Sequence, residues 1–197
     1  MKKAYTLLFD GYADWELGHV LAELRRLGNV EAKTAGFSDT SVVSMGGLRV
    51  QPDKVLSQVG LDDMLIFILP GGYLWEKSYP KEEIESFLHR VERKKIPIAA
   101  ICSATTVLAR TGLLKERKHT SNSLAYLSKM VPGYADRNNY VQTMAIRDRH
   151  IITASGLGSV DFTMEVLKEL DLGTPAMRST WYDAFKHGKY PENLPHE

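Results

Sequence analysis

The sequence of 197 residues has a single cysteine, a formal net charge of only +1 and no long uninterrupted apolar run. One cysteine cannot form an internal disulfide, which favours a reducing compartment. Acidic and basic residues are interspersed, so the basic surface typical of nucleic-acid binding is missing. The first apolar run is broken at Asp10, too early for a signal-peptide core, and no other run could cross a bilayer. We therefore expect a cytoplasmic protein with neither a nucleic-acid nor a membrane partner.

Two further kinds of site are absent from the sequence. No spacing of His, Cys and Asp matches a metal site, and no glycine-rich loop of the Walker or dinucleotide-binding type occurs. We therefore expect no metal and no cofactor. The length and composition fit one domain with one core, which we place at 1–173. Residues 174–197, rich in proline and aromatic side chains, are expected to form a C-terminal appendage packed on that domain.

Short apolar runs alternate with amphipathic segments along most of the chain. Strands are expected at 4–9, 30–35, 64–69, 96–101, 141–146 and 151–154, helices at 17–27, 82–94, 103–110 and 160–170, and a tight hairpin at 42–50. The runs at 64–69 and 96–101 are apolar throughout, as in strands buried on both faces. This alternation predicts an α/β fold, a three-layer sandwich whose central sheet is mostly parallel.

Candidate site residues follow the ends of the expected strands. In open parallel sheets, ligands bind beyond the carboxyl ends of the strands. The junctions at 10–16, 70–72, 102–103 and 153–158 lie there, and they bring together one cysteine, one glutamate and several glycines. We expect a small-molecule site at this edge.

Cys102 follows an apolar strand and precedes a helix of small residues. A nucleophile elbow requires small residues two positions before and two positions after the nucleophile, and Ala100 and Ala104 occupy them. A helix start favours the thiolate, so this interpretation predicts an exposed thiol of low pKa. The alternative is an ordinary core residue, because cysteine is often buried as a small hydrophobe. The spacing alone leaves both interpretations open.

Five segments in the same order resemble the ThiJ/PfpI family, and the likeness extends from the N-terminus to about Leu170. The segments are 10–16, 46–53, 69–72, 100–114 and 153–158. The resemblance implies a flavodoxin-like fold and a homodimer.

The resemblance also implies roles for individual residues. Cys102 resembles the reactive cysteine of the family, and Glu16 the protonated acid that hydrogen-bonds the thiolate, which requires a carboxyl pKa raised by burial and by the sulfur. Gly72 and Ser103 resemble the backbone donors of an oxyanion hole. Alternatively, Glu16 complements the dipole of its own helix and Gly72 is a turn glycine.

One segment departs from the family pattern. Many members carry a histidine in a Thr-Thr-His-like stretch, and placing Thr120-Ser121 on the two threonines puts Asn122 at the histidine position. His119 is offset by three residues and would point the other way, so we expect a surface or interface histidine. Because an asparagine cannot accept a proton, the usual base for acyl transfer is missing. Asn122, Gly71 and Gly156 are expected to line the substrate pocket.

These observations support two hypotheses of different classes. The first is a cysteine-dependent, hydrolase-like enzyme acting on a small carbonyl, amide or related electrophile, as a peptidase, deglycase or glyoxalase does. The missing histidine argues against strong peptidase activity and leaves hydratase or lyase chemistry open. The second is a redox-responsive or chaperone-like stress protein whose Cys102 is oxidised rather than turned over.

Overall fold

The central element of the protein is a 7-stranded sheet in the order β5-β2-β1-β6-β7-β9-β8. We describe residues 2–190 from a computed structural model. The strands are β1 (Lys3–Leu8), β2 (Glu31–Gly36), β5 (Lys54–Val55), β6 (Met64–Leu69), β7 (Ile98–Ile101), β8 (Ala145–Asp148) and β9 (Ile151–Ala154). All neighbouring strands pair in parallel except β8, which is antiparallel to β9. The predicted α/β fold with a mostly parallel sheet is confirmed.

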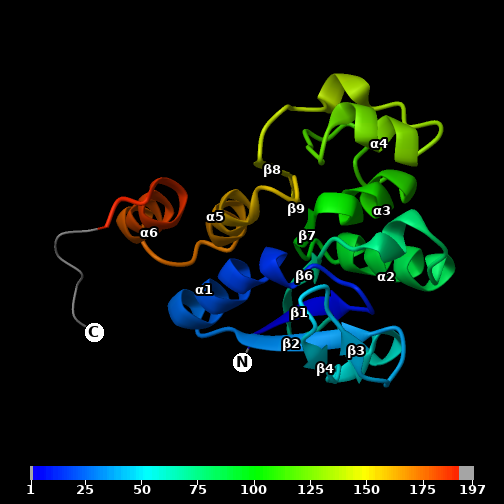
Figure 1. The fold of residues 1–197 in the computed structure, drawn as a ribbon, viewed down its shortest axis with the longest axis horizontal. Helices are drawn as coiled ribbons and strands as arrows, with labels where there is room; N and C mark the ends of the chain where they lie inside the picture. The colour runs from blue at the N-terminus through cyan, green and yellow to red at the C-terminus, as the bar shows by residue number, and fades with distance from the viewer. Residues whose placement is uncertain (1, 191–197) are drawn as a thin grey trace.

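Helices cover both faces of this sheet, which appears between two helical layers in Figure 1. One layer contains α1 (Gly18–Gly28) and α5 (Ser159–Glu169), which pack against each other, and the other contains α2 (Lys81–Arg93) and α3 (Thr105–Arg110). Beyond α3 lies α4 (Leu124–Met130), and beyond α5 lies α6 (Pro175–His187). A separate small hairpin pairs β3 (Val42–Val43) with β4 (Arg49–Val50).

The strands at the centre of the sheet form the core. Every residue of β7 is buried, and so is every residue of β6 except Leu65, as expected for strands covered on both faces. Strand β6 is paired with β1 on one side and with β7 on the other, so that Ile68 lies beside both Thr6 and Ala99. These well-packed strands give the loops at their carboxyl ends fixed starting points.

The chain order reverses between β1 and β6, the position where open sheets of this kind bind ligands. From β1 the sheet continues to β2 on one side, whereas on the other side β6, β7 and β9 follow in chain order. At such a reversal the loops that follow the strands separate in opposite directions and leave room for a ligand. The loops after β1, β6, β7 and β9 all lie at this edge.

The strand expected at 141–146 forms later in the chain, as β8, because its first residues pair elsewhere. Tyr140 forms a bridge with His119, and the Val141 N–H donates to the His119 carbonyl (2.8 Å). The turn to β9 then uses Arg149 and His150, both in the left-handed region (φ 47° and 66°). Two further differences are the edge strand β5 and helix α4, which the sequence patterns did not predict.

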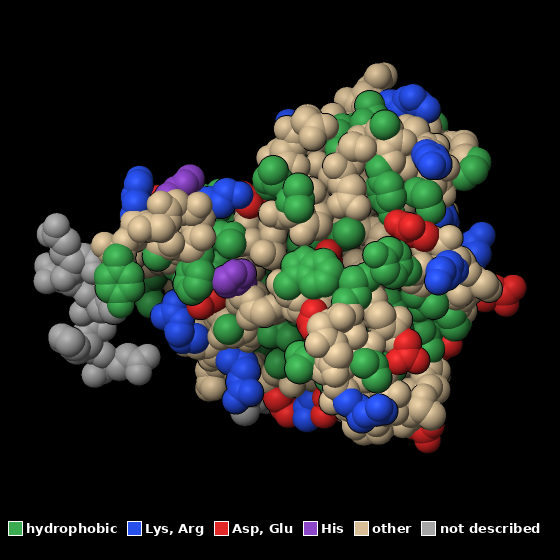
Figure 2. All heavy atoms as spheres, in the orientation of Figure 1, with side chains coloured by type: hydrophobic (Ala, Val, Ile, Leu, Met, Phe, Trp, Pro, Cys, Tyr) green, Lys and Arg blue, Asp and Glu red, His purple; other side chains and the backbone are tan. Residues whose placement is uncertain are grey.

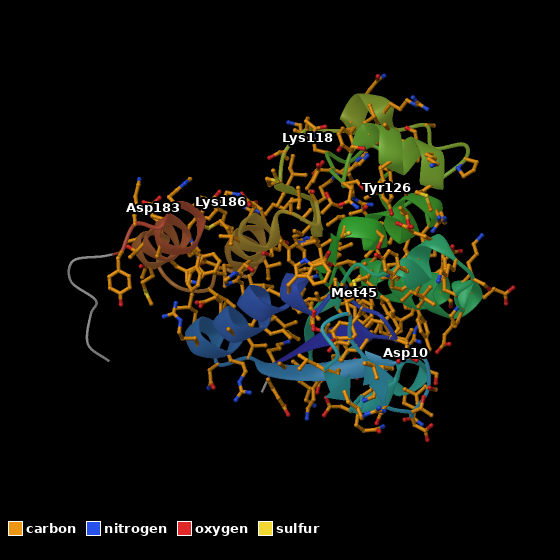
Figure 3. The ribbon with its side chains drawn as sticks, viewed as in Figure 1. Asp10, Met45, Lys118, Tyr126, Asp183 and Lys186 are labelled. Atoms are coloured by element: carbon orange, nitrogen blue, oxygen red, sulfur yellow. The ribbon has the colours of Figure 1, made fainter. Side chains whose placement is uncertain are left out.

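The helix α6 continues the chain after α5 and packs against it. The carboxylate of Asp161 on α5 accepts hydrogen bonds from the Tyr182 hydroxyl (2.7 Å) and the Lys186 ammonium (2.6 Å) of α6; Figure 3 labels Lys186. The expected boundary at residue 173 stays a prediction, and 191–197 of the expected appendage lie outside the described residues. None of the helices in residues 2–190 combines the length and apolar composition of a membrane span.

Candidate active site

Cys102 lies at the end of β7, where the chain enters the 3-10 helix η4 (Cys102–Ala104) and then α3. Its φ is 60°, in the left-handed region that non-glycine residues rarely adopt and that costs about 1–3 kcal/mol. Ala100 and Ala104, two positions away on either side, are fully buried. The sulfur is half-buried. This strained turn has the features of a nucleophile elbow and distinguishes Cys102 from an ordinary core residue.

Glu16 reaches the same point from the loop after β1. It ends the 3-10 helix η1 (Asp14–Glu16), is fully buried and accepts a hydrogen bond from the Gly71 N–H through Oε2 (2.6 Å). Its other oxygen, Oε1, is buried and has no hydrogen-bond partner among residues 2–190. A carboxylate oxygen without a partner is costly to bury. The side chain therefore serves a purpose other than complementing its own helix.

Two glycines make room for these side chains. A Cβ on Gly71 would lie 2.6 Å from Cys102 Cβ and 2.9 Å from both Glu16 oxygens. A Cβ on Gly156, in the loop after β9, would lie 2.8 Å from Cys102 Sγ and 3.2 Å from Glu16 Oε1. All these distances are shorter than ordinary van der Waals contact, so the thiol and the carboxyl pack against bare backbone on two sides.

Burial opposes ionisation of both groups. It raises the pKa of Glu16 from 4.5 to about 7, although the Gly71 amide and the Cys102 thiol act in the opposite direction. Burial also raises the pKa of Cys102 to about 11, the charge of Glu16 adds to this, and Asn122 and the Ser103 amide oppose it. The raised carboxyl pKa agrees with the sequence-based expectation. The expectation of an exposed thiol of low pKa is wrong while Glu16 is ionised. The sulfur is half-buried, and the neighbouring negative charge raises its pKa further.

Asn122 bridges the thiol and the loop after β9. Its Oδ1 accepts from the Gly156 N–H (2.9 Å), which orients the amide so that Nδ2 faces Cys102 Sγ at 3.3 Å. The amide Nδ2 can donate a hydrogen bond to the sulfur, but neither the nitrogen nor the oxygen of the Asn122 amide can accept the thiol proton. The structure thus brings together Cys102, Glu16, Asn122 and Gly156, together with Gly71.

Gly72 and Ser103 are close together but differ from the expected pair of free donors. The Gly72 N–H donates to Ser103 Oγ (2.9 Å), and the same hydroxyl donates to the Gly72 carbonyl (2.9 Å). The Gly72 amide is therefore already occupied by Ser103, and its expected role as an oxyanion donor stays a prediction. These two bonds instead tie the loop after β6 to the loop after β7. The Ser103 amide acts on the thiol itself.

His119 is a core residue rather than the expected surface or interface histidine. Its ring is fully buried, Nδ1 bonds the Arg117 carbonyl (2.7 Å) and Nε2 bonds the Tyr134 hydroxyl. Burial lowers its pKa. His19, by contrast, is half-buried, with its ring edge-on to Phe185 (4.7 Å between centroids). In the part of the chain that the structure describes, no histidine nitrogen hydrogen-bonds Cys102 Sγ.

Sequence patterns missed several polar residues around the site. Thr105 Oγ1 donates to the Cys102 carbonyl (2.6 Å) and also contacts Ser121 Oγ (2.7 Å). Tyr126 of α4, labelled in Figure 3, donates to Glu76 (2.7 Å), which ends the 3-10 helix η3 (Tyr73–Glu76). A threonine bonding the carbonyl three residues earlier is common in helices and could have been anticipated. The partners of Thr105 and Tyr126 are distant in sequence, so no local signal marks them.

The surroundings of the Glu16 carboxyl are partly apolar. Burial, Gly71 and Cys102 account for the pKa of Glu16, with no lysine or arginine of residues 2–190 contributing. Trp15, Tyr73 and Leu157, each adjacent in the chain to a site residue, are exposed by 55%, 64% and 85%. Figure 2 shows hydrophobic side chains gathered across the middle of one face. A neutral, partly apolar ligand suits these surroundings better than an anion.

Other possible sites are separate from Cys102. A hollow of about 470 Å³ lies between β8 and α5, where Glu165 and Glu169 hold Arg147 at 3.2 and 3.1 Å. Among the described residues, no cluster of three or more His, Cys, Asp or Glu side chains could hold a metal ion.

Comparisons with known proteins agree with the geometry. The model of the DJ-1/PfpI family matches residues 2–169. The chain is 34% identical to the Bacillus subtilis protein named "Uncharacterized protease YoaZ", over 95% of this chain and 92% of that protein. It is 30% identical to the Caenorhabditis elegans "Glutathione-independent glyoxalase DJR-1.2", over 73% and 75% of the two chains. A thiJ/pfpI family protein from Bacillus anthracis has a similar structure, with TM-score 0.85, 37% identity and coverage of 95% and 92%.

Proposed function

This chain belongs to the DJ-1/PfpI family, and on that premise we propose that it is a cysteine-dependent enzyme acting on small, neutral electrophiles such as carbonyl compounds or activated amides. Cys102 is the nucleophile and Glu16 its proton partner. The observation that carries the proposal is the buried Glu16 carboxyl, whose Oε1 has no other partner in residues 2–190 and lies with the sulfur against Gly156.

The first step is the formation of the thiolate inside the site. Two negative charges side by side are disfavoured, so Glu16 and Cys102 lose their protons in two separate steps. After the first loss, near pH 7, the pair carries one charge and one proton. When that proton is on Glu16, the charge is on sulfur, where the Asn122 amide and the Ser103 N–H stabilise it. Glu16 thus replaces the missing histidine as the acceptor of the thiol proton.

The second step is the attack on the substrate. The thiolate forms a bond to the electrophilic carbon, and the electron pair of the breaking carbonyl π bond moves to oxygen. The proton held by Glu16 is then available for that oxygen or for a leaving group. The amides near the elbow, above all that of Ser103, are candidates to stabilise the oxygen, whereas Gly72 would first have to release Ser103 Oγ.

This arrangement favours carbonyl addition over peptide hydrolysis. Hydrolysis requires a base to activate water after the acyl group has been transferred, and base assistance is typically worth ~10²–10⁴-fold. Asn122 supplies none. Relatives carry both protease and glyoxalase names. We therefore propose glyoxalase- or deglycase-like chemistry that begins with addition of the thiolate to a carbonyl, where Glu16 moves the proton, with only slow peptidase activity.

A cytoplasmic homodimer remains part of the proposal through the family resemblance. Trp15 and Phe185 are exposed by 55% and 56% and offer apolar surface that a second copy could cover. Sedimentation of the full chain tests it, and a monomer at all concentrations would contradict it.

The rate of Cys102 alkylation by iodoacetamide between pH 5 and 11 tests the proton partner. We expect an inflection near pH 7, where the pair loses its first proton, and a shift of that inflection above 9 in Glu16→Gln. Because Cys102 is the only cysteine, all labelling reports on it, and Cys102→Ala is the blank. A wild-type rate that rises only toward pH 11 would contradict proton acceptance by Glu16.

A substrate panel of small aldehydes and dicarbonyls, activated amides, esters and peptides tests the activity. We expect turnover of neutral carbonyl compounds that disappears in Cys102→Ala. The redox hypothesis makes the opposite prediction: stoichiometric oxidation of Cys102 by peroxide and no turnover of any member of the panel.

A further inference from the structure

We propose that the hydroxyl pair Thr105–Ser121 is a positioning device that holds the Asn122 amide on the Cys102 sulfur. The inference rests on the proposed function only in taking Cys102 as the reactive group. Asn122 lies in the connection between α3 and α4, outside the sheet that places the other site residues. Its distance from the sulfur therefore depends on what ties this connection to the elbow.

The two hydroxyls form a directed chain that ends on Cys102 itself. Thr105 Oγ1 donates its only hydrogen to the Cys102 carbonyl at 2.6 Å. The contact of 2.7 Å with Ser121 Oγ must then use the Ser121 hydrogen, because each hydroxyl has one proton to give. The chain runs from Ser121 through Thr105 to the Cys102 carbonyl, and Asn122 directly follows Ser121.

Burial makes this chain a firm restraint. Thr105 is 0% and Ser121 2% exposed, so water cannot replace either partner without reorganisation. The other anchors of the connection point elsewhere: the Thr120 N–H donates to Thr153 of β9 (2.9 Å), and its hydroxyl donates to the Thr143 carbonyl (2.9 Å). Within residues 2–190, the Thr105–Ser121 pair is the one hydrogen-bonded link from the segment before Asn122 to the backbone of the cysteine.

The consequence is specific to the charged form of the sulfur. The Asn122 amide lowers the thiol pKa by donating to the thiolate, so any lengthening of that contact raises the pKa. A threonine that acts through Asn122 should therefore change the reactivity of Cys102 only while the Asn122 amide is present. A threonine needed merely for folding would show no such dependence.

The test is the rate of Cys102 alkylation by iodoacetamide at pH 8 in the full chain, where the rate follows the thiolate fraction. We expect Asn122→Ala to be slower by about tenfold, and Thr105→Val and Ser121→Ala each by about threefold, from the typical strength of charged and neutral hydrogen bonds. Thr105→Ser, which keeps the hydroxyl, should restore the wild-type rate. The double variant Thr105→Val/Asn122→Ala should be no slower than Asn122→Ala alone.

Thr106→Val is the matched control. Thr106 is equally buried and donates to the Ser103 carbonyl (2.7 Å), the same kind of bond one residue later. Its hydroxyl accepts from Arg110 (3.1 Å), and none of the hydrogen bonds in residues 2–190 joins it to Ser121. Its alkylation rate should equal that of wild type. Equal rates in Thr105→Val and Thr106→Val, or a loss in Thr105→Val that persists without Asn122, would overturn the inference. If Thr105→Val does not fold, Ser121→Ala decides in the same way.

The two proposals fail separately. No turnover of any substrate, with the alkylation pattern intact, would refute the proposed activity and leave the positioning role standing. Turnover with no dependence of alkylation on Thr105 or Ser121 would do the reverse.

Discussion

The two sides of the site are held by different means. Cys102, Gly71 and Gly156 lie one or two residues beyond buried strands, and the Gly71 N–H holds the Glu16 carboxyl, so the sheet determines where these groups lie. Asn122 belongs to the long excursion between α3 and β8, and side-chain hydrogen bonds hold it in place. The strand-end side should therefore tolerate almost no change of volume, whereas the excursion side should respond gradually as single hydrogen bonds are removed.

The largest effect is expected from the charge of Glu16. Its pKa is raised in the folded protein, so its stabilising contribution is complete below pH 4.5 and is lost as the pH rises to about 7. This rise in pKa corresponds to about 3 kcal/mol for a fully buried group. Glu16→Gln does not titrate, so relative to wild type it should gain about 3 kcal/mol of unfolding free energy between pH 4 and pH 8.

Urea unfolding at a series of pH values measures this difference. A constant offset between the two proteins would show that Glu16 titrates normally. The slope of the unfolding free energy against pH is compared between the two proteins, so a fixed cost of replacing the side chain does not affect the result.

Gly71→Ala should have the next largest effect. The new methyl group would lie 2.6 Å from Cys102 Cβ and 2.9 Å from both Glu16 oxygens, closer than van der Waals contact allows. We expect a loss of about 2 kcal/mol of stability from overpacking, together with a strong loss of alkylation because both reacting groups shift. Gly60→Ala is the control, since no atom lies within 4 Å of its added carbon. Similar behaviour of the two variants would mean that the strand-end side is less rigid than the contacts imply.

On the excursion side, Asn122→Asp should slow alkylation at pH 8 by about tenfold or more. The change keeps the shape of the side chain but replaces the donor to sulfur by a negative charge, and hydrogen bonds to charged groups are worth about 1.5–3 kcal/mol. Asn138→Asp adds the same charge at an exposed position and serves as the control. An unchanged rate in Asn122→Asp would remove Asn122 from the site.

The smallest effect is expected from Tyr126→Phe. The variant loses the hydrogen bond that joins α4 to Glu76, an exposed partner that water can satisfy, so stability should fall by only about 0.5–1 kcal/mol. Tyr182→Phe, which loses a similar bond on α6, is the comparison. If the excursion is held by its own side chains, Tyr126→Phe should also slow alkylation slightly, whereas Tyr182→Phe should not.

The outcome for the histidines shows where sequence reasoning stops. The alternation of side chains correctly separated His119 from Asn122, but the expectation of a surface position for His119 was wrong. Its partners are Tyr134 and Tyr140, which follow in the same excursion. The periodicity of hydrophobic residues does not reveal the pocket around His119, because irregular loops form it rather than one face of a helix or strand. The late start of β8 has the same origin.

The patterns in the chain by themselves determined the sheet, its mostly parallel order and the gathering of Cys102, Glu16 and the glycines at one edge. They could do so because the apolar period and the alternation of strands and helices are local properties, and parallel strands bring their carboxyl ends to the same side. Only the tertiary structure decided the ionisation of the Glu16–Cys102 pair, the occupation of the Gly72 amide by Ser103 and the hydroxyl chain from Ser121 to Cys102. These depend on burial and on hydrogen bonds between residues distant in sequence, which exist only once the chain is packed.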